Sequence, residues 1–254
     1  MPPKVFKLAL ILSLFKKYRL SDCNIAFKAK TYVGYETVKG ALIAVEGIDG
    51  SGLTTHSRLL ADALTSAGCP SVYTKEPTDG PIGQVIRSQL SGQSPDPVLM
   101  ALLFAADRAW HVFHDPTLPG GRGMEGALGL GFLVVTDRYK YSSIAYQGAA
   151  GVPTAWLWEL NSFAREADII VYIDVPVELS VARLSARGRR EAFERAEFLV
   201  AVKRRFEEVL RGAEARGVRV LRVRGAEGGS ARPVEEVSQE VFRGVTDALG
   251  YCNR

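Results

Sequence analysis

The sequence predicts an α/β fold in which a five-stranded parallel sheet is covered by helices on both faces. Three observations support this fold. Short apolar runs alternate with helix-period segments from residue 41 to residue 250. A glycine-rich turn joins the first apolar run to the first helical segment. Polar residues follow several of the runs, and ligands of such sheets bind beyond the carboxyl ends of the strands.

The five strands are expected where the apolar runs lie, at residues 41–46, 71–75, 132–136, 168–175 and 218–223. The runs at 41–46 and 132–136 are almost continuously apolar, as expected for strands that are buried on both faces.

Helix-period segments separate these strands. They are expected at residues 56–67, 81–90, 97–114, 141–148, 153–166, 176–186, 191–216 and 233–249. In the first of them, Leu59, Leu60, Ala63 and Leu64 share one helix face. Residues 120–131 hold six glycines and are expected to form a loop. No repeat or linker interrupts residues 41–250, which we interpret as one domain.

Composition is that of a soluble globular protein, with 47% hydrophobic and 24% charged residues among 254. Cys23, Cys69 and Cys252 show no pair spacing, so neither a disulfide framework nor a zinc site is expected. The net charge is +4, but residues 1–40 carry eight Lys or Arg and only two acids. The remainder is therefore slightly acidic, which argues against nucleic-acid binding.

Residues 1–40 are a basic N-terminal extension with one short apolar run at 8–15. This run is too short to span a bilayer, and no clear cleavage site follows it. We expect either a basic, poorly ordered or amphipathic appendage, or a true translation start near Val38. The alternative is an anchor to a membrane surface. N-terminal sequencing of the native protein would distinguish these cases.

Residues 47–55 have the spacing of a phosphate-binding loop. The pattern is Gly, four residues, Gly, Lys and then Ser or Thr, and the chain meets it at Gly47, Gly52 and Thr54. Glycines let successive backbone N–H groups face phosphate oxygens, and the following helix adds its N-terminal amides. The residues expected around the phosphates are Gly47, Ile48, Asp49, Gly50, Ser51, Gly52, Leu53, Thr54 and Thr55.

From about Ala41 to Leu249 the chain resembles thymidylate kinases, which are phosphate-loop kinases of nucleoside monophosphates. Five ordered motifs carry the resemblance: EGIDGSG at 46–52, TKEP at 74–77, LFAADR at 103–108, DRY at 137–139 and SSIAYQG at 142–148. The resemblance implies a three-layer αβα P-loop NTPase fold for residues 41–250. It also implies transfer of the γ-phosphoryl group of ATP to dTMP with Mg²⁺, by a cytoplasmic homodimer.

The same resemblance implies a set of dTMP-binding residues: Asp49, Glu76, Arg87, Phe104, Arg108, Arg138, Ser143 and Tyr146. Phe104 would stack on the pyrimidine ring, and Arg108, on the same helix face, would contact its carbonyl edge. Ser143 would bind the base, and Tyr146 would crowd the sugar 2′ position. Asp49 would accept a hydrogen bond from a sugar hydroxyl. The alternatives are core packing for Phe104 and Tyr146, ion pairing with an acid for Arg108, and a solvated turn for Asp49.

The expected catalytic residues are Asp137, Arg138, Arg187 and Arg190. Arg138 would grip the acceptor phosphate, with Arg87 as a second candidate, because a guanidinium fork suits phosphate. Asp137 and the Thr54 hydroxyl are the expected Mg²⁺ ligands. The alternative for Asp137 and Arg138 is a structural ion pair.

A lid is expected around residues 183–195, which contain five arginines, including Arg187 and Arg190. The alternative is a solvated helix face. His111 and His114 are three residues apart on a helix, without further ligands nearby, so we interpret them as packing or surface residues.

The main departure from the pattern is Leu53, which stands where the loop lysine is expected. Losing that charge should cost on the order of 10²–10⁴ in rate. Lid arginines or Lys75, where the family more often has arginine, could replace it. The kinase interpretation therefore competes with a nucleotide-binding protein of weakened activity and with a kinase for another nucleoside or nucleotide.

Overall fold

The structure is a computed structural model that describes residues 40–91, 95–186 and 192–250. The predicted N-terminal extension falls outside these ranges, as do Arg187 and Arg190 of the expected lid. None of the described helices has the length and apolar character needed to cross a membrane.

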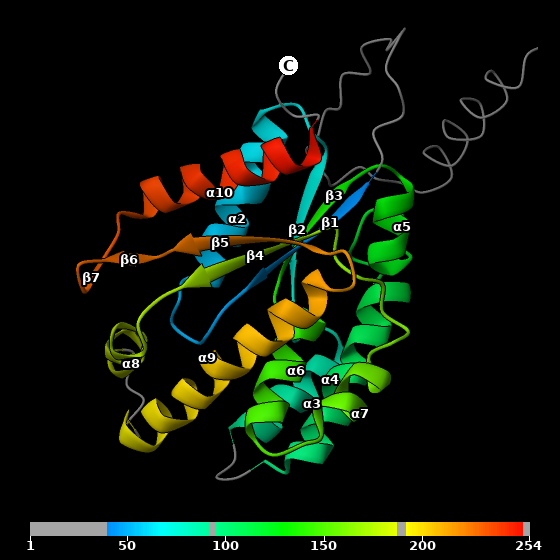
Figure 1. Cartoon of the computed structure of the whole chain (residues 1–254). Helices are drawn as coiled ribbons and strands as arrows, with labels where there is room; N and C mark the ends of the chain where they lie inside the picture. The colour runs from blue at the N-terminus through cyan, green and yellow to red at the C-terminus, as the bar shows by residue number, and fades with distance from the viewer. Residues whose placement is uncertain (1–39, 92–94, 187–191, 251–254) are drawn as a thin grey trace, which may run out of the picture. The chain divides into compact units, whose positions relative to one another are not determined.

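Five parallel strands form the central sheet, as the sequence predicts (Figure 1). They are β1 (Ala41–Glu46), β2 (Ser71–Lys75), β3 (Leu133–Asp137), β4 (Ile169–Asp174) and β5 (Arg219–Arg224). Their order across the sheet is β2-β3-β1-β4-β5, so the first strand is central. Every residue of β1 and β3 is buried, which explains why their sequences are almost continuously apolar.

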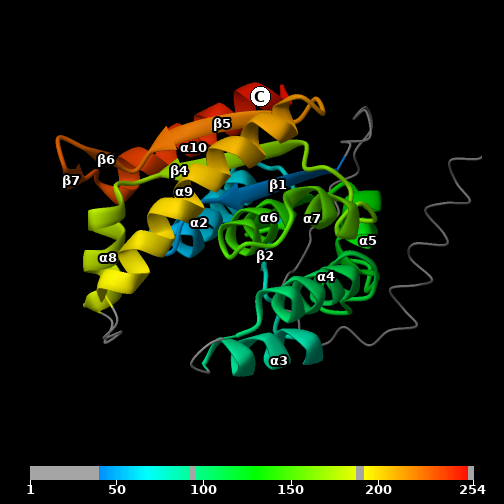
Figure 2. The ribbon, with the colours of Figure 1, turned by 60° about the horizontal axis from the view of Figure 1, so that its bottom comes forward.

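Helices cover both faces of this sheet (Figures 1 and 2). On one face α2 (Leu53–Ser66) packs beside α10 (Val234–Leu249). On the other, α6 (Lys140–Ala149) packs against α9 (Ala192–Glu214). Farther from the sheet lie α4 (Pro97–Phe113), which contacts α6, and α3 (Pro81–Leu90), which contacts α4. The remaining helices are α5 (Gly123–Gly129), α7 (Thr154–Leu160) and α8 (Val177–Ser185).

The predicted loop at 120–131 is wrong in its centre, because residues 123–129 form helix α5. Met124, Ala127 and Leu128 recur at helical spacing and are buried, since α5 packs against α4 and β3. Their apolar contacts outweigh the low helix propensity of the glycines.

Three smaller differences separate the structure from the expectations. The helix predicted at 153–166 ends at Leu160, and the side chain of the next residue, Asn161, bonds back to the carbonyl of Leu157. A short hairpin, β6 (Ala226–Glu227) with β7 (Ser230–Ala231), precedes α10. Cys69 is disulfide-bonded, whereas the sequence analysis expected no disulfide framework.

Candidate active site

Three strands end side by side at the carboxyl edge of the sheet. The pairing aligns Val45 of β1 with Asp137 of β3, and Lys75 of β2 with the same aspartate. The chain leaves these strands as the glycine-rich loop, the Glu76-Pro77 segment and the Arg138-Tyr139 segment. Motifs far apart in the sequence therefore meet at one edge, as expected for a ligand site in a parallel sheet.

Two glycines of the loop are required by close packing. Gly47 and Gly50 have positive φ values of 156° and 82°. A Cβ atom on Gly50 would lie 2.9 Å from the carbonyl oxygen of Ser180 on α8. Helix α8 is fastened to the loop at this point, because the Ser180 hydroxyl donates to the carbonyl of Asp49 and Arg183 Nη1 donates to that of Gly50 at 2.9 Å. Arg183, the first arginine of the segment expected to form a lid, lies against the loop.

The loop amides do not all point the same way. The N–H of Asp49 donates to the Tyr146 hydroxyl at 2.8 Å, and that of Ser51 donates to the carbonyl of Ile48 at 3.2 Å. Both groups are engaged by the chain itself. A phosphate would therefore depend chiefly on the other amides of the loop and on the start of α2.

Leu53 is the first residue of α2, and its side chain belongs to the hydrophobic core with an exposure of 6%. Its Cδ2 atom lies 3.3 Å from where a Cβ atom on Gly47 would stand. The position that carries lysine in the general pattern is therefore an apolar packing position here, and Leu53 offers the loop only its backbone.

Thr54 and Asp137 meet next to the loop. The Thr54 hydroxyl donates to Asp137 Oδ2 at 2.5 Å. Burial raises the pKa of Asp137, while the bond from Thr54 and the charge of Arg138 oppose that rise. The two expected Mg²⁺ ligands are thus adjacent, and hydroxyl and carboxylate oxygens suit Mg²⁺. Among the described residues, no group of three or more His, Cys, Asp or Glu side chains could hold a metal.

Arg138 is the non-glycine residue with a positive φ, 70°, in the described chain. Two hydrogen bonds fix its backbone. The N–H of Arg138 donates to the carbonyl of Val45 at 3.0 Å, and the Thr136 hydroxyl donates to the carbonyl of Arg138 at 2.7 Å. Such a conformation is strained for a residue with a Cβ atom and is typical of functional sites.

The guanidinium of Arg138 reaches the phosphate loop. Nη1 donates to the carbonyl of Gly47 at 3.0 Å and to the Ser142 hydroxyl at 2.9 Å, and Nη2 pairs with Asp49 Oδ1 at 2.8 Å. The ion pair of this arginine is therefore made with Asp49 rather than with its neighbour Asp137. Its guanidinium also lies over the Tyr146 ring, 5.2 Å from the centroid.

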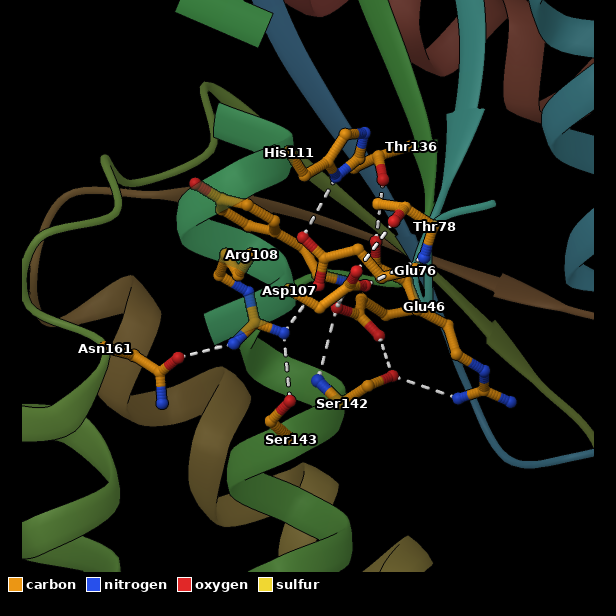
Figure 3. A network of polar contacts seen from close by, with 12 residues as sticks. Glu46, Glu76, Thr78, Asp107, Arg108, His111, Thr136, Ser142, Ser143 and Asn161 are labelled. Carbon is orange, nitrogen blue, oxygen red and sulfur yellow. Dashed lines mark hydrogen bonds and ion pairs between the residues drawn. The ribbon is translucent and has the colours of Figure 1, made fainter. Parts of the chain in front are cut away.

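Arg108 is almost fully buried, at 1% exposure, and lies at the centre of a polar network (Figure 3). Nη2 pairs with Glu76 Oε2 at 2.5 Å and donates to Ser143 at 2.9 Å, while Nη1 donates to Asn161. The pairing with an acid that the sequence left open is thus present, with Glu76 rather than Asp107. Asp107 instead accepts two bonds from Thr78.

On the far side of Glu76 stands His111, also buried (Figure 3). Its Nδ1 lies 3.1 Å from Glu76 Oε1, and its Nε2 lies 2.7 Å from the Thr74 hydroxyl. The sequence analysis interpreted His111 as a packing or surface residue; it is buried, and both of its ring nitrogens take part in this polar network.

The other expected residues lie around this network. Phe104 is half-buried one turn before Arg108 on α4. Tyr146 packs edge-on against Phe198 and Phe206 of α9. Arg87 lies near the surface, where Nη1 donates to the carbonyl of Pro77 at 3.3 Å.

The sequence analysis missed Glu46, Ser142, His111 and Asn161 as members of the site. A signal existed for Glu46, because a charged residue ends an otherwise apolar buried strand. For Asn161 no local signal existed, since it lies 53 residues from Arg108.

Comparisons with known proteins agree on one family. Residues 45–222 match a family model described as "Thymidylate kinase". The "Putative thymidylate kinase" of Aeropyrum pernix is 50% identical over 212 residues, which cover 83% of this chain and 98% of that protein. The "Probable thymidylate kinase" of Pyrobaculum calidifontis is 40% identical over 214 residues, 84% of this chain and 99% of that protein. The "Probable thymidylate kinase" of Caldivirga maquilingensis is 38% identical over 214 residues, which cover 83% of this chain and 96% of that protein.

Proposed function

The chain belongs to the thymidylate kinase family of phosphotransferases, and we propose that it transfers the γ-phosphoryl group of ATP to dTMP, giving dTDP. One observation carries the assignment of the site: the Arg138 guanidinium is held at the phosphate loop, between the Asp49 carboxylate and the start of α6. Phosphoryl transfer needs positioning and charge neutralisation, which a fixed guanidinium beside a phosphate loop supplies.

We assign the triphosphate of ATP to the free amides of the loop and the N-terminus of α2. Mg²⁺ fits at the Thr54–Asp137 pair, whose oxygen atoms are 2.5 Å apart. Mg²⁺ commonly uses one or two protein oxygens together with substrate phosphates, and when bound it neutralises charge on those phosphates. The Thr54 hydroxyl can donate its proton to Asp137 and still offer a lone pair to Mg²⁺, so both residues can serve as ligands without breaking this bond.

We assign dTMP to the region around Phe104, Arg108, Ser143 and Tyr146. Phe104 would stack on the base, while the buried network orients Arg108 and Ser143 towards its polar edge. Tyr146 is held by the loop through the N–H of Asp49 and would exclude a 2′ hydroxyl. Arg138 and Arg87 would hold the acceptor phosphate.

A second candidate is a protein that binds thymidine nucleotides and transfers phosphate poorly. The buried Leu53 favours it, because the loop lysine is missing. Arg138, Arg183 and Lys75 are described cations near the loop or the strand ends that could carry the missing charge.

We also propose a cytoplasmic homodimer. Helices α3 and α4 pack on each other and expose large apolar side chains: Val85, Leu90, Val98, Leu99 and Leu102. A second copy of the chain would cover this face. A Leu102→Arg variant should be a monomer by light scattering, whereas Leu130→Arg, an exposed leucine next to α5 and away from this face, should remain dimeric. Two dimeric variants would exclude this interface.

The activity is tested by following ADP formation from ATP and Mg²⁺ with a panel of nucleoside monophosphates. Turnover of dTMP in preference to the other acceptors supports the proposal. Tight dTMP binding without turnover supports the second candidate, and preference for another acceptor would refute dTMP as the substrate. Arg138→Met should abolish turnover, while Arg222→Met, on an exposed ion pair, should not. This pair of variants excludes a contaminating host kinase.

A further inference from the structure

Glu46 is fully buried where β1 ends, and no role proposed above uses it. Its carboxylate faces the beginning of α6. Oε1 accepts from the backbone N–H of Tyr139 at 2.9 Å and from that of Ser142 at 3.3 Å. Helix α6 begins at Lys140 and has no capping bond from the side chain of Tyr139, its own N-cap residue. Glu46, at the end of β1, therefore caps the N-terminus of α6, a position where the helix dipole favours a negative charge.

The other carboxylate oxygen connects Glu46 to Arg138. Oε2 accepts from the Ser142 hydroxyl at 2.5 Å, and the same hydroxyl accepts from Arg138 Nη1 at 2.9 Å (Figure 3 shows the Glu46–Ser142 contact). A hydroxyl has one proton, so it can accept from the guanidinium while donating to the carboxylate. This chain of bonds keeps Nη1 beside the carbonyl of Gly47.

The backbone of Arg138 depends on the same region. Its φ of 70° is enforced on one side by the bond to Val45, which precedes Glu46. On the other side, Glu46 holds the N–H of the next residue, Tyr139. Strained conformations of this kind persist only where the surroundings fix them at several points.

We propose that Glu46 is a positioning residue for phosphoryl transfer: through Ser142 and the amides of α6, its carboxylate holds the Arg138 guanidinium at the phosphate loop. This inference rests on the proposed function for its catalytic consequence. The positional claim itself concerns the geometry of Arg138 and can be tested without turnover.

The ionisation of Glu46 adds a consequence. Burial raises its pKa to about 7, against the hydrogen bonds from Ser142 and Tyr139 and the charge of Arg138. Arg138 is the charged group that acts on Glu46 directly. Arg138 in turn faces Asp49 of the loop, Asp137 of β3 and Tyr146 of α6. The Tyr139 side chain, next to the N–H that bonds Glu46, faces Glu76, Arg108, Glu125 and Arg165.

All three hydrogen-bond contacts to Glu46 are with donors, so the arrangement requires the ionised form. A protonated Glu46 would bring its own O–H towards a donor. The Ser142 hydroxyl would then have to turn its own proton away, and the negative charge that this chain of bonds presents to the Arg138 guanidinium would be lost. Activity should therefore fall as the pH drops through about 7.

The test uses Glu46→Gln, with Glu166→Gln as the matched control. Glu166 also bonds to the first turn of α6, through Lys140 and Tyr141, but has no link to Arg138. In Glu46→Gln the amide nitrogen would face the Ser142 hydroxyl as a second donor. We expect kcat/KM for dTMP at pH 8 to fall about 10- to 100-fold, and the acid limb near pH 7 to disappear. The control should keep both the rate and the limb.

Ser142→Ala gives a second, independent variant, because it cuts the relay but leaves Glu46 and its backbone bonds in place. Its loss of rate should match that of Glu46→Gln, and the double variant should lose little more. Full additivity of the two losses would overturn the proposal, as would an acid limb that Glu46→Gln leaves unchanged.

Crystal structures of the wild type and the three single variants test the positional claim even if no nucleotide is turned over. The Arg138 guanidinium should leave the Gly47 carbonyl in Glu46→Gln and Ser142→Ala, and stay in Glu166→Gln. An unmoved guanidinium in both of the first two variants would refute the inference. Absence of turnover in the wild type would instead count against the proposed function.

Discussion

Replacing Glu76 by glutamine should destabilise the protein strongly, because a buried guanidinium would lose its counter-charge. Glu76 and Arg108 are 2.5 Å apart, and their side chains are 2% and 1% exposed. The remaining contacts of Arg108, to Asn161 and Ser143, are neutral. Breaking a buried pair costs about 3–5 kcal/mol.

Glutamine keeps one acceptor for Arg108. The expected loss of unfolding free energy therefore lies near the lower end of this range, at about 3 kcal/mol. At ~2–4 °C per kcal/mol for a domain of this size, the melting temperature should drop by roughly 6–12 °C. The assay is urea unfolding at fixed pH, followed by circular dichroism, with calorimetry for the melting temperature.

Glu214→Gln is the matched control. Its pair with Arg222 is as short, 2.6 Å, but the two side chains are 39% and 41% exposed. An exposed pair contributes at most about 1 kcal/mol. A second comparison adds Arg108→Met to Glu76→Gln, which removes both buried charges. The double variant should be more stable than the sum of the single losses implies. Equal losses for Glu76→Gln and Glu214→Gln, or strict additivity, would refute the reasoning.

Three further predictions concern the loop and the base site. If the missing charge limits the reaction, Leu53→Lys should raise kcat by up to about 10²-fold. The variant should also lose about 1.5–3 kcal/mol of folding free energy, because a buried leucine is removed. No rise of kcat in steady-state kinetics would show that another cation has taken over the role. Phe104→Ala should weaken dTMP binding by ~1–3 kcal/mol in calorimetry while ATP binding stays constant, and an equal loss for both nucleotides would contradict a stacking role. Gly50→Ala should cost more stability and activity than Gly68→Ala, since both have positive φ but only Gly50 meets Ser180; equal effects in thermal unfolding would show that α8 gives way freely.

Much of the fold was predictable because periodicity is a local property. The five strands follow from apolar runs, and the structure confirms them within one residue at each end. The helix-period segments are confirmed within about three residues, except that the helix predicted to reach residue 166 ends at Leu160. Helix α5 was missed because its glycines suggest a loop, and only burial against α4 and β3 makes it helical. The glycine-rich turn between β1 and α2 was predictable for the same reason, since its spacing lies within residues 47–55; its phosphate-binding role stays a prediction.

The partners of the site residues were not predictable, because they lie far apart in the sequence. Arg138 pairs with Asp49 across 89 residues, and Ser142 bonds to Glu46 across 96. These pairs form because the sheet order places β1 between β3 and β4, so that the segments after β1 and β3 lie next to each other. Local sequence chemistry therefore determined which elements form, where the glycine-rich loop lies and which family the motifs resemble. Tertiary packing alone decided that Leu53 is buried, that Arg108 pairs with Glu76 and that Glu46 stands behind Arg138, because burial and counter-charges arise only when distant segments pack together.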